Sequence, residues 1–181
     1  MLDFSGLIRA LAEKFSRTGV RYALIGGMAL HAAGLTRATG DIDLLVHADD
    51  ADKLRSVLLE TGFKVFHEDE NVLQAAVPWL PIGGVDVIWS RRQYSRDMLA
   101  RRVSTPDGIY VVDPEGIIGL KVQAIANAPE RRLSDAVDIE WLLRTHSQSM
   151  NMALVREYFA LFSMTAELEN ILTRIKENRP C

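Results

Sequence analysis

Two aspartates in one apolar segment are the residues of this chain whose types and spacing best suit chemistry. Asp41 and Asp43 flank Ile42, and Leu44, Leu45 and Val46 follow them, which is typical of a buried strand. Residues two apart in a strand project to one face of the sheet, so we expect the two carboxylates side by side. Such a pair repels unless a cation lies between the carboxylates, and Mg²⁺ prefers oxygen ligands.

A third carboxylate, Asp86, lies inside a second apolar segment, Val85-Asp-Val-Ile-Trp89. If that strand neighbours the first, three carboxylates converge and can hold two metal ions. Two ions activate an attacking oxygen and stabilise a leaving phosphate. Taken singly, the Asp-x-Asp pair also suits a solvated edge strand or a calcium loop, and Asp86 also suits a structural acid. The combination favours a metal site made of Asp41, Asp43 and Asp86.

A glycine pair, Gly26-Gly27, follows the short apolar run Tyr22–Ile25 and precedes an expected helix over residues 28–33. The N–H groups at a helix N-terminus attract anions, and glycine lets a phosphate approach the backbone closely. A plain turn is the common alternative for Gly-Gly. Together with the carboxylates, this unit predicts a site for a nucleoside triphosphate and Mg²⁺.

The elements that must position these residues alternate between strands and helices in the first part of the chain. Asp113-Pro114-Glu115 then predicts a helix start, and the pattern after it is helical. We therefore expect an α/β (α+β) core over residues 1–112 and a C-terminal helical region over 113–181 that packs on the core. Helices are expected at 2–17, 49–61, 114–126, 131–145 and within 151–177, and strands at 22–25, 41–46, 63–66, 72–77 and 85–89.

The order Gly26-Gly27, Asp41-Ile-Asp43 and a later strand with one Asp resembles the nucleotidyltransferase superfamily. Within it, the motifs are similar to those of the minimal and AbiEii-type nucleotidyltransferases of prokaryotes. Two helical stretches, 119–124 and 132–139, resemble the Lys-x-x-Ala and Arg-x-Lys-Asp-x-x-Asp-Ile stretches of that family. The resemblance covers most of residues 20–143. Gly27 stands where many relatives have Ser, and Ser134 where Lys is common.

This resemblance implies a mixed sheet flanked by helices and transfer of a nucleotidyl group from an NTP, with Mg²⁺ and release of pyrophosphate. Relatives of this branch modify transfer RNA or a partner protein, often within toxin–antitoxin pairs, so we expect a macromolecular acceptor. The implied catalytic and metal residues are Asp41, Asp43 and Asp86, and the implied nucleotide-binding residues are Gly26, Gly27, Arg37, Thr39, Lys121 and Asp135.

Several of these assignments have a structural alternative. Arg37 suits a phosphate contact and a surface ion pair equally. Asp135 and Asp138 share a helix face, where they suit either an active-site wall opposite Lys121 or a Lys–Asp bridge between helices. A run of five arginines between residues 91 and 102 suits RNA phosphates or a solvated helix.

The composition sets wider limits on function. The 181 residues are 48% hydrophobic and 25% charged with a net charge of −3, typical of a globular protein rather than a general polyanion binder. A single cysteine excludes a disulfide framework, and the charged N-terminus and lack of a long apolar run predict a cytoplasmic protein without a membrane span. A homodimer or a small helical partner protein fits this class. A non-catalytic antitoxin-like or scaffold protein and a small-molecule nucleotidyltransferase remain the alternative functions.

Overall fold

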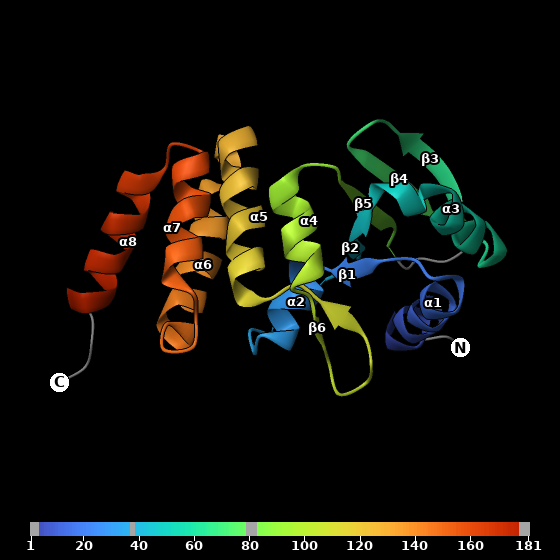
Figure 1. Ribbon diagram of the computed structural model, residues 1–181, viewed down its shortest axis with the longest axis horizontal. Coiled ribbons are helices and arrows are strands. Elements are labelled where there is room, and N and C mark those ends of the chain that lie inside the picture. The colour runs from blue at the N-terminus through green and yellow to red at the C-terminus, as the bar shows by residue number, and fades with distance from the viewer. Residues whose placement is uncertain (1–3, 37–38, 79–82, 178–181) are drawn as a thin grey trace. The chain divides into compact units, whose positions relative to one another are not determined.

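The computed structural model describes residues 4–36, 39–78 and 83–177 (Figure 1). The chain divides into two compact units, Met1–Asp113 and Pro114–Cys181. Strands and helices alternate in the first unit, whereas the described part of the second is helical.

A seven-stranded sheet forms the centre of the first unit as far as the structure describes it, in the order β3-β4-β5-β2-β1-β7-β6. Strand β2 runs parallel to β5, and β1 runs parallel to β7; the other neighbours are antiparallel. The mixed sheet expected from the sequence is therefore confirmed. Its strands are β1 (Tyr22–Leu24), β2 (Ile42–His47), β3 (Lys64–Glu68), β4 (Val72–Ala76), β5 (Val85–Ser90), β6 (Val103–Ser104) and β7 (Tyr110–Val111).

One face of this sheet carries the main hydrophobic core. Alternate residues such as Leu44 and Val46 on β2 and Val87 on β5 pack there against buried residues of α1 and α3, such as Phe15 and Leu54. The residues between them, including Asp43 and Asp86, have the opposite parity and lie on the other face. The helices of this unit are α1 (Phe4–Thr18), α2 (Gly26–Ala32), α3 (Ala51–Glu60) and α4 (Gln93–Ala100), with the short 3₁₀ helix η1 (Ala48–Asp50) before α3.

The second unit packs its helices side by side (Figure 1). The expected helical pattern over 151–177 is divided into two helices, because the chain reverses at Ser163, whose φ is +58°. Asn151 caps the first of them by accepting hydrogen bonds from the N–H groups of Ala153 and Leu154, at 3.1 and 3.2 Å. The elements are α5 (Pro114–Asn127), η2 (Pro129–Arg131), α6 (Arg132–His146), α7 (Met152–Leu161) and α8 (Thr165–Glu177).

Two local differences from the sequence expectations affect the site. Helix α2 already begins at Gly26, and β2 begins at Ile42, so Asp41 precedes the strand. A short hairpin of β6 and β7 lies where no strand was expected.

None of the helices in the described segments is long and apolar enough to cross a membrane.

Candidate active site

Asp43 and Asp86 lie next to each other on neighbouring parallel strands. The register of β2 and β5 pairs Asp43 with Asp86, and it also pairs Ile42 with Val85 and Leu44 with Val87. The flanking apolar residues are buried, whereas both aspartates are half-buried. Paired residues project to the same face, and neighbouring strands lie about 4.8 Å apart. The strand alternation therefore places two carboxylates at one point of the sheet.

Asp41 is held differently from the other two carboxylates. It precedes β2, and its Oδ1 accepts a hydrogen bond from the N–H of Gly84 at 2.9 Å. The backbone N–H of Ile42 donates to the carbonyl of Gly84, also at 2.9 Å. The hydroxyl of Thr39 donates to the carbonyl of Asp41 at 3.1 Å. Asp41 thus lies where β2 and β5 begin, tied to the loop that enters β5.

Glycines let the surrounding backbone come close to these carboxylates. Gly26 has a φ of +59°, and a Cβ atom on it would lie 2.1 Å from Oδ2 of Asp43. A Cβ atom on Gly83 would lie 2.2 Å from Oδ1 of Asp41 and 1.9 Å from the carbonyl oxygen of Gly40. A side chain at either position would displace a carboxylate. Gly26 therefore makes room for Asp43, a role that sequence reasoning, concerned with phosphate, did not consider.

Gly27, near the start of α2, and Thr39, in the segment before β2, also lie close to each other. A Cβ atom on Gly27 would lie 2.8 Å from Cβ of Thr39. A serine at position 27, as in many relatives of the resembled family, would therefore require Thr39 to shift. Gly27 and Thr39, two of the predicted nucleotide-binding residues, are neighbours in space, whereas Arg37 lies outside the described residues.

Sequence reasoning missed Gln74 and the Gly83-Gly84 pair. Gln74 on β4 pairs with Asp86 in the register of β4 and β5, and its Nε2 donates to Oδ1 of Asp86 at 3.0 Å. Gln74, Asp86 and Asp43 therefore form a polar row across three strands. The available signals were a lone amide among apolar residues in 72–77 and two adjacent glycines before a strand.

The predicted residues of the second unit form a buried ionic cluster. Nζ of Lys121 on α5 lies 2.7 Å from Oδ1 of Asp135 and 2.7 Å from Oδ2 of Asp138, both on α6. Nε of Arg131 donates to Oδ2 of Asp135 at 3.1 Å. Asp135 and Asp138 are only 2% and 4% exposed. This geometry agrees with the structural alternative for these residues, a Lys–Asp bridge that joins α5 and α6.

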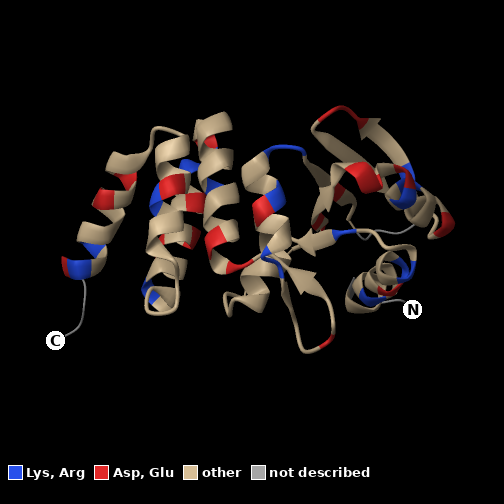
Figure 2. Cartoon of the chain, in the orientation of Figure 1, with Lys and Arg blue, Asp and Glu red and all other residues tan. Residues whose placement is uncertain are grey.

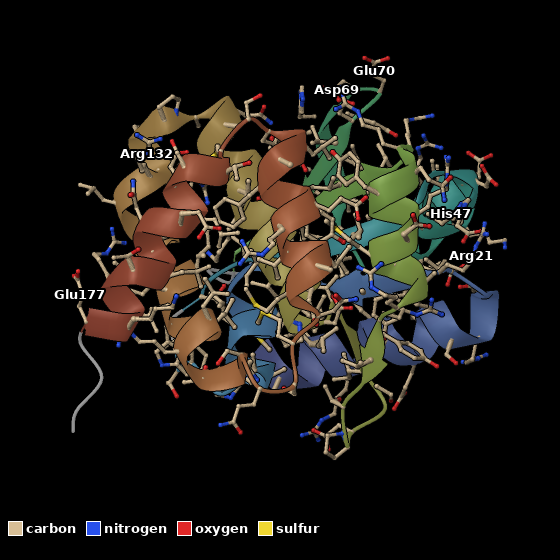
Figure 3. The ribbon with its side chains drawn as sticks, turned by 60° about the vertical axis from the view of Figure 1, so that its left-hand side comes forward. Arg21, His47, Asp69, Glu70, Arg132 and Glu177 are labelled. Atoms are coloured by element: carbon tan, nitrogen blue, oxygen red, sulfur yellow. The ribbon has the colours of Figure 1, made fainter. Side chains whose placement is uncertain are left out.

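The arginine run between residues 91 and 102 lies on α4 and its flanks, and several of its members contact groups of the first unit. Arg91 donates to the carbonyl of Glu70, in the β3–β4 turn from which Asp69 and Glu70 project (Figure 3). Arg101 forms an ion pair with Asp113 at 3.0 Å, and the guanidinium of Arg102 lies 4.5 Å from the centroid of the Tyr110 ring. These contacts give Arg91, Arg101 and Arg102 structural roles and leave RNA binding as a prediction.

The carboxylates of the site supply only part of the ligand set that a hard cation such as Mg²⁺ needs. No group of three or more acidic, His or Cys side chains in the described segments is arranged to hold a metal ion. Oδ1 of Asp41 accepts a hydrogen bond from the Gly84 N–H. Mg²⁺ is commonly held by only one or two carboxylates together with substrate phosphates. Asp43 and Asp86 supply two adjacent carboxylates of that kind.

A mixed sheet with carboxylates on adjacent parallel strands, next to a helix that begins with Gly26-Gly27, is typical of the nucleotidyltransferase fold. A family model described as "uncharacterised nucleotidyltransferase" matches residues 3–179, so the chain belongs to that family. The superfamily expected from the sequence is thereby confirmed, whereas the AbiEii-type branch stays a prediction. No curated protein sequence matches the chain.

Solved structures share this fold at low sequence identity. The solution structure of the antibiotic-resistance factor ANT(2")-Ia has a TM-score of 0.65 at 17% identity, covering 93% of this chain and 96% of that chain. An antigenic nucleotidyltransferase-like protein from Paracoccidioides brasiliensis has a TM-score of 0.60 at 19% identity, covering 97% and 93%. The lincosamide antibiotic adenylyltransferase LnuA, with lincomycin bound, has a TM-score of 0.55 at 17% identity, covering 78% and 96%. At these identities the likeness shows the fold.

Proposed function

We propose that this protein transfers a nucleotidyl group from an NTP to an acceptor hydroxyl in an Mg²⁺-dependent reaction. The observation that carries the proposal is the pairing of Asp43 with Asp86 on one face of the sheet, beside the Gly26 bend. Membership of a nucleotidyltransferase family supports the reaction class. Two adjacent carboxylates on one sheet face repel each other, and a cation between them would relieve that repulsion, which supports a metal-dependent site.

In the proposed mechanism the protein mainly positions charges, as is usual in phosphoryl transfer. Asp41 and Asp43 would bind the Mg²⁺ that accompanies the triphosphate, and Asp86 would contribute to a second ion site on the acceptor side. When bound, Mg²⁺ neutralises phosphate charge and lowers the pKa of the acceptor hydroxyl. The acceptor oxygen attacks the α-phosphorus while its proton passes to the Asp86 carboxylate. The bond between the α-phosphorus and the oxygen that bridges to the β-phosphate breaks, and pyrophosphate leaves with that oxygen.

The remaining predicted residues are proposed to bind the nucleotide. The N–H groups of Gly26 and Gly27, at the start of α2, would bind phosphate. Thr39 lies against Gly27 and donates a hydrogen bond to the Asp41 carbonyl. Arg37 contributes a positive charge to phosphate. For Lys121 and Asp135, the ion pair between them supports the helix bridge more strongly than a direct nucleotide contact.

For the acceptor, we propose a macromolecule, transfer RNA or a partner protein, as in the toxin–antitoxin relatives that the motifs resemble. A specific observation favours a second candidate, a small hydroxyl-bearing molecule. ANT(2")-Ia, which matches this chain over nearly its whole length, has been solved with adenylyl-2"-tobramycin. LnuA is named for a lincosamide.

The test is incubation with each radiolabelled NTP, Mg²⁺ and, in separate reactions, total cell RNA, total cell protein, an aminoglycoside and a lincosamide. We expect label to enter one acceptor class. The double variant Asp41→Asn/Asp43→Asn should abolish the transfer, because the charges that hold the metal are lost. The matched control is Asp107→Asn, which neutralises an exposed aspartate in the β6–β7 turn.

The outcomes separate the candidate functions. Undiminished transfer by the double variant would overturn the site. Label in RNA or protein supports the macromolecular acceptor, and label in an antibiotic supports the second candidate. If the wild-type protein neither labels an acceptor nor binds Mg²⁺–NTP, the non-catalytic partner protein becomes the better description.

A further inference from the structure

Gln74 is the only described side chain on β4 that donates a hydrogen bond to a carboxylate of the proposed site. Its Nε2 lies 3.0 Å from Oδ1 of Asp86. The two residues occupy paired positions of antiparallel strands, so the contact follows from the register of the sheet. Both side chains are half-buried, and the neighbours of Gln74 along the strand, Leu73 and Ala75, are fully buried on the opposite face.

The hydrogen bond from Gln74 to Asp86 has a neutral donor and an anionic acceptor. A neutral amide N–H donor stabilises the anionic form of a carboxylate without cancelling its charge. Because Oδ1 of Asp86 accepts this hydrogen bond, the rotation of the carboxylate group is restricted. Its second oxygen, Oδ2, does not take part in this hydrogen bond and would be the atom that contacts a cation or an acceptor hydroxyl. A carboxylate that acts on a metal usually needs such a partner to hold its orientation.

We propose that Gln74 is a positioning residue that orients Asp86 for metal binding and acceptor activation. The proposal rests on the proposed function, because it assigns Asp86 to that site. It adds a fourth residue to a site that the Asp-x-Asp and single-Asp motifs describe with three carboxylates. Gln74 touches neither nucleotide nor acceptor in this role; it acts through Asp86.

The test compares Gln74→Leu and Gln74→Glu with the wild-type protein. Leucine keeps the volume and removes the donor, while glutamate keeps the shape and replaces the donor with an acceptor next to Asp86. We expect Gln74→Leu to weaken Mn²⁺ affinity, measured by calorimetry in the presence of a non-hydrolysable NTP, by roughly 10- to 100-fold. Gln74→Glu adds a carboxylate that itself attracts the cation, so we expect it to keep Mn²⁺ affinity at or above the wild-type value. We expect kcat to fall in both variants with an unchanged KM for NTP, because both lose the donor that orients Asp86.

Gln93→Leu is the matched control. Gln93 on α4 makes the same type of contact, with Nε2 donating to Oδ1 of Asp97 at 2.7 Å, but both of these side chains are exposed and Asp97 belongs to no predicted site. We expect wild-type Mn²⁺ affinity, kcat and KM. Thermal unfolding of all variants identifies any effect that arises from a loss of folding, and a glutamate variant that folds but has a low kcat keeps the test decisive.

Two failures can be told apart. Wild-type kcat in both Gln74 variants, together with wild-type Mn²⁺ affinity in Gln74→Leu, would overturn this inference alone, provided that Asp86→Asn lowers both quantities. Wild-type affinity in Asp86→Asn, or no Mn²⁺ binding by the wild-type protein, would overturn the proposed site and this inference with it. A parallel loss of Tm and of activity in both Gln74 variants would show a structural role for Gln74 and would also contradict the inference.

Discussion

At the scale of single residues, the proposed site depends on how closely backbone can approach a carboxylate. Gly26 adopts a left-handed backbone conformation beside Asp43, and Gly83 lies against both Asp41 and the Gly40 carbonyl. No larger residue fits these positions without moving the acid. A glycine that is normally credited with accommodating phosphate thus also accommodates the protein's own carboxylate.

Gly26→Ala tests this role of glycine. The alanine should cost about 1–3 kcal/mol of folding free energy, because its φ of +59° is unfavourable for an L-residue. Its Cβ should also push the Asp43 carboxylate away, so we expect nucleotidyl transfer to fall at least tenfold. Urea denaturation and the transfer assay measure the two effects.

Gly108→Ala is the matched control for that variant. Gly108 has a φ of +75°, but a Cβ atom there would meet nothing within 4 Å. It should therefore show a similar loss of stability and retain full activity. Equal activity in the two alanine variants would mean that the Asp43 contact does not matter for catalysis.

At the scale of elements, helix α5 is tied to α6 by a buried charge cluster. Lys121 and Arg131 lie within 3.1 Å or less of Asp135, and Lys121 also contacts Asp138. The Lys121 side chain is 12% exposed. Burying these charges is compensated by their mutual contacts, so removing one member has a larger effect than replacing the whole set.

Lys121→Met should therefore destabilise the protein by about 3–5 kcal/mol, because it leaves two buried carboxylates without their shared cation. The triple variant Lys121→Met/Asp135→Leu/Asp138→Leu should recover much of that loss. Denaturant unfolding monitored by circular dichroism checks both. If Lys121→Met retains wild-type stability and loses only NTP binding, the nucleotide-contact assignment replaces the bridge.

The sequence predicted the elements that carry the carboxylates but not all of the contacts between them. Alternation within the two apolar strands was sufficient to place Asp43 and Asp86 on faces that the sheet register then brings together. Asp41 was expected inside the strand, yet its side chain bonds the Gly84 N–H and the strand begins one residue later. Gln74 could not be predicted, because its importance depends on which strand pairs with β5.

At the scale of the whole molecule, the net charge of −3 conceals an extensive pairing of opposite charges. Acidic and basic residues are interspersed along the helices of the second unit (Figure 2). In the first unit, Asp50 is 2% exposed and accepts hydrogen bonds from Arg21 and Lys53. Arg21 lies beside His47 (Figure 3), whose backbone N–H donates to the Arg21 carbonyl.

These pairs make folding stability depend on pH. Burial alone would raise the pKa of Asp50, but the hydrogen bonds from Arg21 and Lys53 outweigh it and hold this pKa well below its usual range. The hydrogen bonds from Arg55 to Glu68 and from Arg144 to Glu140 likewise lower the pKa of each glutamate. A group whose pKa is lower in the folded state stabilises folding above its unfolded pKa and loses that contribution as the pH falls.

We therefore expect the free energy of unfolding to be level near neutral pH and to fall as the pH drops below about 4–5. One salt-bridged aspartate typically accounts for roughly 2–3 kcal/mol of such a loss. Asp50→Asn should be less stable at pH 7 and should show a shallower loss in acid. Urea unfolding from pH 7 to pH 3 measures both, and identical slopes for variant and wild type would contradict the role of Asp50.

The hydrogen bond between Gly84 and Asp41 also has a consequence for the order of folding. It joins residues separated by 43 positions, and the β3–β4 hairpin lies within that separation. Closing a long loop costs more chain entropy than forming a local hairpin, so the hairpin is expected to form before β2 meets β5. A chain still being synthesised carries Asp41 and Asp43 before Asp86 and the Gly84 N–H exist. A ligand that requires all of these groups can therefore bind only after β2 has met β5. Once bound, the ligand stabilises the completed fold.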